Sequence, residues 1–505
     1  MTVPVLLLAL AACRPPSQPA PDPGVDSGVD TAAPDPGVDS GVDTAAPESW
    51  AMPVLDFGRG LTYIADDSER ATAYDAFVPL VDVAEAAVGS DQLAELTARD
   101  PSLTTFSYQL DLTGCQHVDC GGSMPVDTRW DALSESHFLH FSEATRLHFY
   151  ALDDSDLGAI DVPGCGSEVE STAACRAQTY VWGDRRFLLA VGDPALRDTM
   201  ASWLLAATDP TVRGVFLDEH SHQLTEAMKF GVQAVIESGG AIREYDGLRP
   251  GDPALDTAWS ADVAGALAAY REALAAQQRF LLVNVATYYT AADAQAQAQA
   301  AGGVTVEGLW RPDAFDGTSR FFGVVTALRT LVQAGGRADL YGVLGYTGPS
   351  GYTAGAYADP VSRYRMWRLG ASLLVRASSA DTGVAYFNPT LDIDFLGDAL
   401  AWRDEWLPAY TVDLGAPLDE PALHEGASYT ASDGTTCSVA WVERHFARGQ
   451  VLVRAKDAWN CGDWDAVVDV PLDAPMVPLR PDGSYGEAVT VVPLHNGEAW
   501  VLAAP

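Results

Sequence analysis

From Trp50 to about Tyr410 the chain alternates short apolar runs with longer stretches of helical pattern. Such alternation is typical of βα units, in which a helix connects each strand to the next parallel strand. The strands of a parallel sheet are covered by helices and appear in a sequence as apolar runs. The sequence therefore predicts a parallel sheet with helices packed against it over this part of the chain.

Eight apolar runs are candidate strands, with helical stretches between them. The predicted strands are Leu61–Ala65, Val81–Ala86, Leu103–Leu110, Val212–Leu217, Phe280–Val285, Val304–Glu307, Leu340–Gly345 and Val384–Phe387, and the helical stretches include Asp91–Arg99, Asp193–Ala207, Ser260–Gln278, Ser319–Ala334 and Pro360–Arg376. Eight strands over this length match the size of an α/β fold, the (β/α)8 or TIM barrel. A doubly wound open sheet is the alternative. It would place a Gly-rich phosphate loop after the first strand, and Leu61–Asp67 has none.

The segment from Cys115 to Trp182 departs from this alternation. Aromatic and polar runs such as His137–Phe141 and Arg146–Tyr150 interrupt it. We expect an excursion after the third strand, formed by a small hairpin that disulfides hold in place. Insertions of this length are usually functional or cover a site. We expect His137 and His140 to pack or to contact a substrate rather than to catalyse.

After Tyr410 the pattern changes to short alternating strands separated by turn residues. These strands are Cys437–Val442, Gly449–Arg454, Ala466–Val470, Ala488–Val492 and Ala499–Leu502. No helical pattern accompanies them, which predicts a small all-β, sandwich-like domain. We expect the barrel over residues 51–410 and the β-domain over residues 411–505. The β-domain is expected to pack against the barrel, with direct sugar binding as the alternative.

The first residues form a short apolar run, Thr2–Ala12, that ends in Leu10-Ala11-Ala12-Cys13. A transmembrane helix needs about 20 apolar residues, whereas a secretory signal needs a shorter run followed by small residues. The ending is similar to the bacterial lipobox, in which the cysteine is acylated, although no basic residue precedes Cys13. We expect residues 1–13 to be a lipoprotein signal. The chain would then be an exported cell-envelope lipoprotein, attached to the membrane through the lipid on Cys13 alone.

A repeat follows this signal. The segment Pro21–Ala33 recurs unchanged as Pro34–Ala46. Its Pro, Gly, Asp and Ser residues cannot bury a core, and a solenoid needs three or more repeats. The sequence therefore predicts a disordered, solvated linker over residues 14–50. Calcium binding by the repeated aspartates is the alternative.

The cysteines beyond Cys13 fall into three couples that are close in sequence. In an exported chain an even set of cysteines indicates disulfides, although the sequence does not fix their connectivity. We expect neighbours to pair, as Cys115–Cys120, Cys165–Cys175 and Cys437–Cys461. A zinc site would instead need tight C-x2-C pairs with matching histidines, and the sequence has none.

The formal net charge of the chain is −39. Residues 14–48 contribute seven acids and one arginine, a net of −6, which leaves −33 on the rest of the chain. A field of this sign repels nucleic acids and anionic lipid surfaces, so we expect no nucleic-acid partner. Neutral and cationic partners remain open, and solubility alone also accounts for such a charge. The chain is expected to be a monomer.

Two of the predicted strands lead directly into carboxylates. Asp218 follows the fourth strand, and Glu307 ends the sixth. The active site of a (β/α)8 barrel lies at the carboxyl ends of its strands. Glycoside hydrolysis needs two carboxylates, one to protonate the leaving oxygen and one to attack the sugar or activate water. Asp218 and Glu307 are therefore the candidate catalytic residues.

Other strand ends carry side chains suited to a sugar, because aromatic faces stack on sugar rings and amides bind hydroxyls. Packing in the core or at the rim is the alternative for each of them. The candidate substrate-binding residues are Glu219, His220, Asn284, Tyr288, Trp310 and Tyr346.

The segment from Asp218 to His222 also has the composition of a metal site in a hydrolase. Glu307 is the only further ligand evident in the sequence, and His220 and His222 lie beyond the strand end. We therefore expect no metal and no cofactor. The sequence has no Gly-x-Ser-x-Gly, Walker or His-Glu-x-x-His signature.

Several of these segments together resemble a known group. They are Gly214–Asp218, the Asn284 strand, Val306–Gly308, the helix Met366–Val375 before Tyr386-Phe387, and the tail segments Val412–Pro417 and Arg444–Val453. The chain resembles the hypothetical glycosyl hydrolase families, which are barrel enzymes, often exported, with a C-terminal β-domain. They are related in pattern to the polygalactosaminidase-like and α-galactosidase-like barrels. Arg454 stands where those proteins usually have Asn.

The resemblance implies a nucleophile at Asp218 and an acid/base at Glu307. The prediction is an exported glycoside hydrolase that cleaves an extracellular oligo- or polysaccharide. Two alternatives stay open: a surface glycan-binding lipoprotein without catalysis, and a metal-dependent hydrolase that uses His220 and His222.

Overall fold

The computed structural model describes residues in one compact unit of the chain. The chain divides into residues 1–47 and residues 48–505, and the described residues all belong to the second unit. They are residues 49–56, 70–72, 74–75, 78–85, 90–110, 112–114, 130–151, 156–166, 173–181, 184–218, 220–221, 223–224, 232–285, 292–306, 310–341, 357, 359–377, 384–387, 406–431, 434–457, 461 and 466–505. The predicted signal, its Cys13 and the repeat lie outside them.

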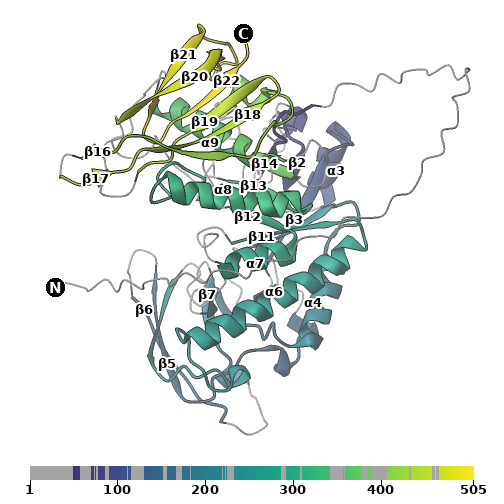
Figure 1. Ribbon diagram of the computed structural model, residues 1–505. Helices are drawn as coiled ribbons and strands as arrows, with labels where there is room; N and C mark the ends of the chain where they lie inside the picture. The colour runs from purple at the N-terminus through teal and green to yellow at the C-terminus, as the bar shows by residue number, and fades with distance from the viewer. Residues whose placement is uncertain are drawn as a thin grey trace, which may run out of the picture. The chain divides into compact units, whose positions relative to one another are not determined.

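A parallel sheet of eight strands organises this unit (Figure 1). In sheet order the strands are β1 (Leu55–Asp56), β2 (Val83–Glu85), β3 (Thr104–Leu110), β9 (Gly214–Asp218), β11 (Phe280–Asn284), β12 (Gly303–Val306), β13 (Arg337–Leu340) and β14 (Val384–Phe387). Each neighbouring pair is parallel, and the order in the sheet follows the order in the chain. A doubly wound sheet reverses its strand order, so that alternative is excluded.

The unreversed order makes the sheet curl into a barrel. Crossovers between parallel strands are right-handed, so strands added always on the same side place their helices on one face. The other face becomes the interior. One apolar cluster there joins Leu55 of β1 to Tyr386 of β14, with Phe106, Phe216 and Leu282 from strands between them. The first and last strands thus contribute to the same interior core, as in a (β/α)8 barrel.

Helices cover the outer face of the sheet. They are α3 (Ser90–Arg99), α4 (Pro194–Ala207), α6 (Pro253–Ala275), α7 (Ala292–Ala301), α8 (Thr318–Gln333) and α9 (Pro360–Val375). Short 3-10 turns lie at Val78–Leu80, Trp130–Ala132, Glu135–His137, Ala173–Cys175, Arg243–Tyr245 and Pro408–Thr411. Within the described part of the chain, no helix is both long enough and apolar enough to cross a membrane.

Three of these helices begin with the same local signal, an aspartate followed by proline. The carboxylates of Asp193, Asp252 and Asp359 each accept a hydrogen bond from a backbone N–H in the first turn. The proline that follows occupies the first helical position, where its missing N–H costs nothing. This signal explains why α6 begins at Pro253, well before the predicted start at Ser260.

Most predicted strands of the barrel are confirmed, with changes at two places. The seventh strand begins at Arg337 rather than at Leu340, and it ends where the predicted strand starts. The sheet also contains β1 at Leu55–Asp56, while the predicted first strand Leu61–Ala65 lies outside the described residues. The helix α7 is absent from the predictions, because its Ala and Gln residues have almost no apolar periodicity.

The excursion is larger than the predicted hairpin. It contains two three-stranded antiparallel sheets: β4 (Thr113–Gly114), β8 (Asp184–Leu188) and β7 (Gln178–Val181), and β10 (Val232–Ser238), β5 (Thr145–Ala151) and β6 (Asp156–Val162). Because β10 follows β9, the segments after the third and the fourth barrel strands build this region together. The prediction of a single hairpin after the third strand is therefore corrected.

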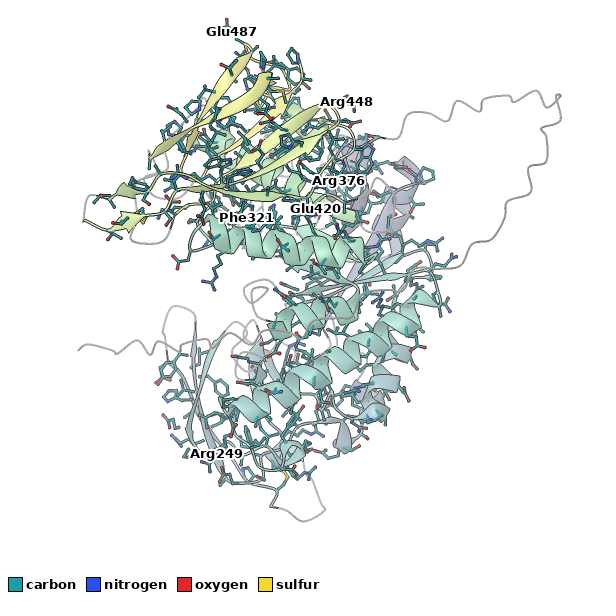
Figure 2. All side chains as sticks on the ribbon, in the orientation of Figure 1. Arg249, Phe321, Arg376, Glu420, Arg448 and Glu487 are labelled. Carbon is teal, nitrogen blue, oxygen red and sulfur yellow. A yellow bond between two sulfur atoms is a disulfide. The ribbon has the colours of Figure 1, made fainter. Side chains whose placement is uncertain are left out.

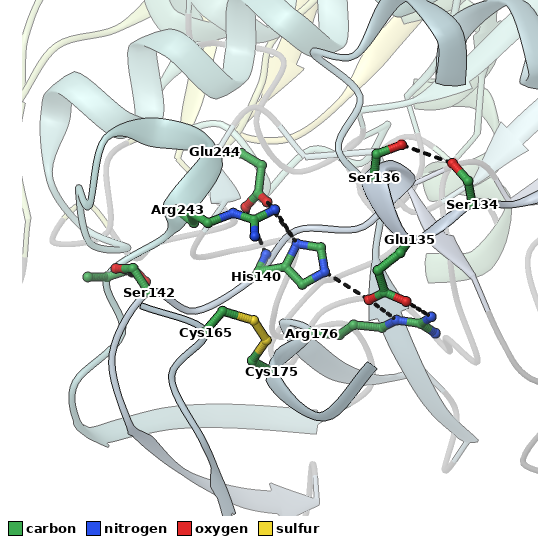
Figure 3. A network of polar contacts seen from close by, with 11 residues as sticks. Ser134, Glu135, Ser136, His140, Ser142, Cys165, Cys175, Arg176, Arg243 and Glu244 are labelled. Atoms are coloured by element: carbon green, nitrogen blue, oxygen red, sulfur yellow. Dashed lines mark hydrogen bonds and ion pairs between the residues drawn. A yellow bond between two sulfur atoms is a disulfide. The ribbon is translucent and has the colours of Figure 1, made fainter. Parts of the chain in front are cut away.

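A buried histidine joins several segments of the excursion (Figure 3). His140 is fully buried, and its Nδ1 lies 2.7 Å from Glu244 Oε1 while its Nε2 lies 3.0 Å from Glu135 Oε1. Arg243 donates to Glu244 at 2.9 Å, and Arg176 pairs with Glu135. Each ring nitrogen therefore contacts a carboxylate from a different segment. His140 thus joins segments of the excursion through buried polar contacts.

Two of the three predicted disulfides are present in the described residues. Cys165 pairs with Cys175 beside the His140 network, with 5.6 Å between the Cα atoms. Cys437 pairs with Cys461 at 5.7 Å. Cys115 and Cys120 lie outside the described residues.

The predicted β-domain is confirmed as an antiparallel sheet of six strands. In sheet order they are β15 (Ala422–Glu425), β18 (Ala440–Phe446), β19 (Gly449–Val453), β22 (Ala499–Ala503), β20 (Val467–Pro478) and β21 (Val489–His495), beside a small pair, β16 (Tyr429–Thr430) and β17 (Thr436–Cys437). In β19, Val451 and Val453 belong to the main core while Leu452 belongs to a second cluster on the opposite face. The central strands are therefore buried on both sides.

The β-domain supplies hydrogen-bond donors to the carboxyl end of helix α9. Arg444 on β18 is 1% exposed and donates to the carbonyls of Leu373, Leu374 and Arg376. The last four carbonyls of a helix have no partner within the helix. Arg329 of α8 donates to the Arg376 carbonyl at 2.8 Å and pairs with Glu420, which Figure 2 shows near Arg376. The barrel and the β-domain therefore share one polar interface.

We predict that Arg444→Met lowers the free energy of unfolding by about 3–5 kcal/mol, because it leaves buried carbonyls without their donor. The measurement is equilibrium denaturation followed by circular dichroism. The exposed arginine variant Arg448→Met serves as the matched control and is expected to cost under about 1 kcal/mol. Equal effects of the two variants would contradict this role of Arg444.

We also predict an acid-sensitive contribution from the His140 network. Burial raises the pKa values of Glu135 and Glu244, but hydrogen bonds from Arg176 and His140 outweigh burial, so both pKa values are lowered. The stability that these carboxylates provide is fully present above their ordinary pKa of about 4.3 and is lost as the pH falls through the lowered values. Glu244→Gln should therefore destabilise the protein at pH 7, by about 1–3 kcal/mol, and much less at low pH.

The measurement is urea denaturation at pH 7 and at several values between pH 5 and 3. The exposed variant Glu425→Gln provides the control and should leave the pH dependence of stability unchanged. If Glu244→Gln shows the same pH dependence as the unmodified protein, the network does not contribute in this way.

Candidate functional site

Asp218 is the last residue of β9 and lies at the carboxyl end of the barrel. The four residues before it, Gly214–Leu217, are buried, and Asp218 itself is half-buried. The strand therefore carries this carboxylate from the core to its edge. This is the end of a (β/α)8 barrel at which active sites are found.

Two neighbouring strands each direct one polar side chain to Asp218. The hydroxyl of Tyr108 on β3 donates to Oδ2 at 2.5 Å, and the amide Nδ2 of Asn284 on β11 donates to Oδ1 at 2.7 Å. Both carboxylate oxygens therefore accept a hydrogen bond from a side chain. The group is held in orientation from both sides.

The strand register explains why these three side chains meet. Side chains alternate between the two faces of a strand. Phe216 and Leu282 belong to the interior cluster, so Asp218 and Asn284, two residues further along, point to the same interior. On β3, Leu110 pairs with Asp218, which places Tyr108 one step deeper on the same face. Its hydroxyl reaches up to the carboxylate.

Aromatic rings lie beneath this polar group. The rings of Tyr108 and Phe216 are 5.7 Å apart, and those of Phe106 and Phe216 are 6.3 Å apart in an edge-to-face arrangement. Apolar rings below the carboxylate close the barrel interior to water. Asp218, Tyr108 and Asn284 therefore form a polar layer above a packed core.

The structure places two other predicted site residues away from a ligand-accessible position. Trp310 is fully buried, donates through its indole N–H to Ser372 Oγ at 2.9 Å, and packs against Phe321 and Trp367. Its ring faces are occupied by packing, which is the alternative that the sequence left open. His220, just beyond β9, is 3% exposed.

The remaining predicted site residues lie outside the described part of the chain. They are Glu219, Glu307, Tyr288 and Tyr346, together with His222 of the metal alternative. Among the residues that the structure does describe, no group of three or more His, Cys, Asp or Glu side chains is arranged to hold a metal.

Tyr108 is the site residue that the sequence analysis missed. Its strand was predicted correctly, but a tyrosine in an apolar run is ordinarily a packing residue. The available signal was the alternation of side chains along the strand. Phe106 and Tyr108 share the interior face of β3, and Tyr108 is the polar one and lies nearer its carboxyl end.

Similarity to known proteins is found among solved structures and not in sequence. No family model matches the chain, and no curated protein matches it in sequence. Among solved structures, the chain is similar to an α-amylase from Malbranchea cinnamomea, with 9% identity, a TM-score of 0.40, and coverage of 86% of this chain and 89% of that one.

It is also similar to a trehalose-6-phosphate hydrolase from Bacillus licheniformis, with 10% identity, a TM-score of 0.41, and coverage of 90% and 99%. A maltogenic α-amylase from Thermotoga neapolitana shows 8% identity, a TM-score of 0.41, and coverage of 90% and 98%. Likenesses at this level do not assign the chain to a family.

The geometry predicts that Asn284→Asp is destabilising in a pH-dependent way. A second carboxylate would lie against Asp218, and two like charges at this distance cannot both ionise without a cost. We expect a loss of about 1–3 kcal/mol at pH 7, from the unmade hydrogen bond and the repulsion, and a smaller loss at pH 4, where one carboxylate takes up a proton.

Denaturation at the two pH values measures this effect. Asn284→Leu is the matched variant, because it removes the same hydrogen bond without adding a charge. If both variants lose equal stability at both pH values, the carboxylate of Asp218 does not face position 284 as described.

Proposed function

We propose that this protein is a glycoside hydrolase that cleaves a carbohydrate by a two-carboxylate mechanism. The observation that carries the proposal is Asp218, a carboxylate at the carboxyl end of a barrel strand that Tyr108 and Asn284 hold by its two oxygens. Carboxylates that accept hydrogen bonds in this way are suited to a role as an anion. Asp218 is therefore proposed as the nucleophile or as the electrostatic partner of the developing positive charge.

Glu307 is proposed as the acid/base. In the sequence it directly follows Val306, the last residue of β12. Within β12, Thr305 pairs with Asn284, and Val304 and Val306 belong to the core that faces the helices. The odd-numbered positions of β12 thus share the interior face, and Glu307 continues that series in the sequence.

The distance between strands supports this pairing of roles. β9 and β12 are separated by one strand, β11, so their backbones lie about 10 Å apart across the sheet. Inward side chains from two such strands bring their carboxyl groups into the range of about 5–9.5 Å that glycosidases use. A sugar bound there would contact Asn284 and Tyr108 through its hydroxyls, with the buried rings below it.

We further propose that the chain acts outside the cytoplasm, tethered by a lipid on Cys13. The disulfides Cys165–Cys175 and Cys437–Cys461 are compatible with an oxidising compartment. An extracellular oligo- or polysaccharide is the proposed substrate.

The test is a set of variants measured against a panel of polysaccharides and aryl glycosides. We predict that Glu307→Gln lowers kcat by about 10²–10⁴-fold, since general acid–base catalysis contributes that much. Asp218→Asn should be at least as inactive. Glu425→Gln, an exposed substitution, is the control and should keep full activity, and all variants should retain the circular dichroism spectrum of the parent.

Three outcomes would contradict the proposal. One is turnover of Glu307→Gln at the unmodified rate. Another is activity that a chelator abolishes, which would favour the metal-dependent hydrolase. The third is tight binding of a glycan with no cleavage by the parent protein, which would favour a surface glycan-binding protein.

A further inference from the structure

A polar cavity lies at the end of the barrel opposite to Asp218. It has a volume of about 690 Å³ and is lined by residues from the amino ends of the strands. Asp82 stands directly before β2, Arg213 directly before β9, and Arg337 is the first residue of β13. Along β9, Arg213 and Asp218 are five residues apart, or about 17 Å at the rise of a strand. The cavity is therefore distinct from the Asp218 site.

The interior core separates the two ends. Leu55, Val83, Phe106, Phe216 and Leu282 fill the barrel between them. A barrel interior packed in this way is a core and not a pore. A molecule in the cavity at the amino ends of the strands would therefore enter from solvent on that side, where Ser102, Arg213 and Gln278 are exposed.

The cavity concentrates positive charge. Three guanidinium groups line it, those of Arg213, Arg337 and Arg376, against one carboxylate, Asp82. The chain as a whole has 69 acidic and 30 basic residues, so a local excess of arginine runs against its composition. Asp82 is engaged by the backbone, because its Oδ2 accepts a hydrogen bond from the N–H of Val54 at 2.7 Å.

Arg337 is held in place by rings rather than by an acid. Its guanidinium lies 4.4 Å from the centroid of the Phe280 ring and 5.9 Å from that of Tyr386, and it donates to the Tyr386 hydroxyl. Among the described side chains, no carboxylate lies within ion-pair distance of Arg337 or Arg213. Asp339, two residues further on β13, is fully buried and does not line the cavity.

The third arginine of the cavity is Arg376, which follows a helix and not a strand of the barrel. It follows α9, is 3% exposed, and its guanidinium lies 5.7 Å from the centroid of the Trp50 ring. Polar groups suited to oxygen atoms surround the three arginines, among them Ser49, Ser102 and Thr104. Guanidinium groups bind carboxylate and phosphate groups through paired, charge-assisted hydrogen bonds.

We propose that this cavity is a binding site for a small organic anion that carries carboxylate or phosphate groups. Its volume suits a ligand of sugar or organic-acid size, because ligand sites usually occupy about 300–1,000 Å³. The arginines attract the anion locally, although the field of the whole protein repels it. Binding therefore depends on these few side chains.

The experiment measures binding of citrate and of inorganic phosphate to the full-length protein by isothermal titration calorimetry at constant ionic strength. Sodium chloride at the same ionic strength provides the reference. We expect saturable binding of at least one of the two anions, and a loss of affinity of about tenfold or more in Arg213→Gln and in Arg337→Gln, since each removes a charged donor pair.

Arg249→Gln is the matched control, because Arg249 is an exposed arginine in another part of the unit that pairs with Glu143 (Figure 2). It should bind the anion like the parent. Arg213 is exposed, so its variant tests the site even if Arg337→Gln proves unstable. Absence of saturable binding by both anions, or equal affinity in Arg213→Gln and the parent, would overturn the proposal.

Discussion

The order of the parallel strands is the constraint on which the rest of this structure depends. Each strand is added on the same side of the one before it. The helices therefore lie outside, and apolar side chains of the barrel strands, from β1 to β14 in sheet order, meet inside. The carboxyl ends then form one rim of the barrel and the amino ends the other. Asp218 with its two partners lies at the first rim, and the cavity lined by Arg213, Arg337 and Arg376 lies at the second. The core between the rims keeps the two sites apart.

This acidic chain buries several of its arginines. Arg329, Arg363, Arg444 and Arg454 are each at least 95% buried, and each donates to backbone carbonyls. A buried guanidinium offers five donors and so satisfies several carbonyls at once. These arginines are withdrawn from the surface, which leaves the exterior more negative than the composition alone implies. In the cavity lined by Arg213, Arg337 and Arg376, by contrast, guanidinium groups face a common space.

The sequence predicted those features that depend on local pattern. The fourth, fifth and sixth strands were found because Gly214–Leu217, Phe280–Val283 and Gly303–Val306 are mostly apolar runs, and each predicted carboxyl end lies within one residue of the observed end. The described disulfides joined cysteines that are close in sequence. Features that depend on distant pairing were missed. The excursion was simplified because β5 pairs with β10 across the whole of β9, and proximity to a strand end could not distinguish Trp310 in the core from a residue at the rim.

The polar interface formed by Arg444 has a consequence for how such a protein can be divided. The composition changes near Tyr410, and a boundary there suggests two interchangeable modules. Helix α9 nevertheless takes its terminal hydrogen bonds from β18, and Gly370 in its middle leaves room for Ala499, since a Cβ there would come within 2.8 Å of the alanine side chain. Helix α9 of the barrel therefore depends on residues of the β-domain for its terminal hydrogen bonds and for its packing. Any recombination that exchanges the C-terminal part would need to preserve this fit, so the two halves are expected to be inherited as one piece.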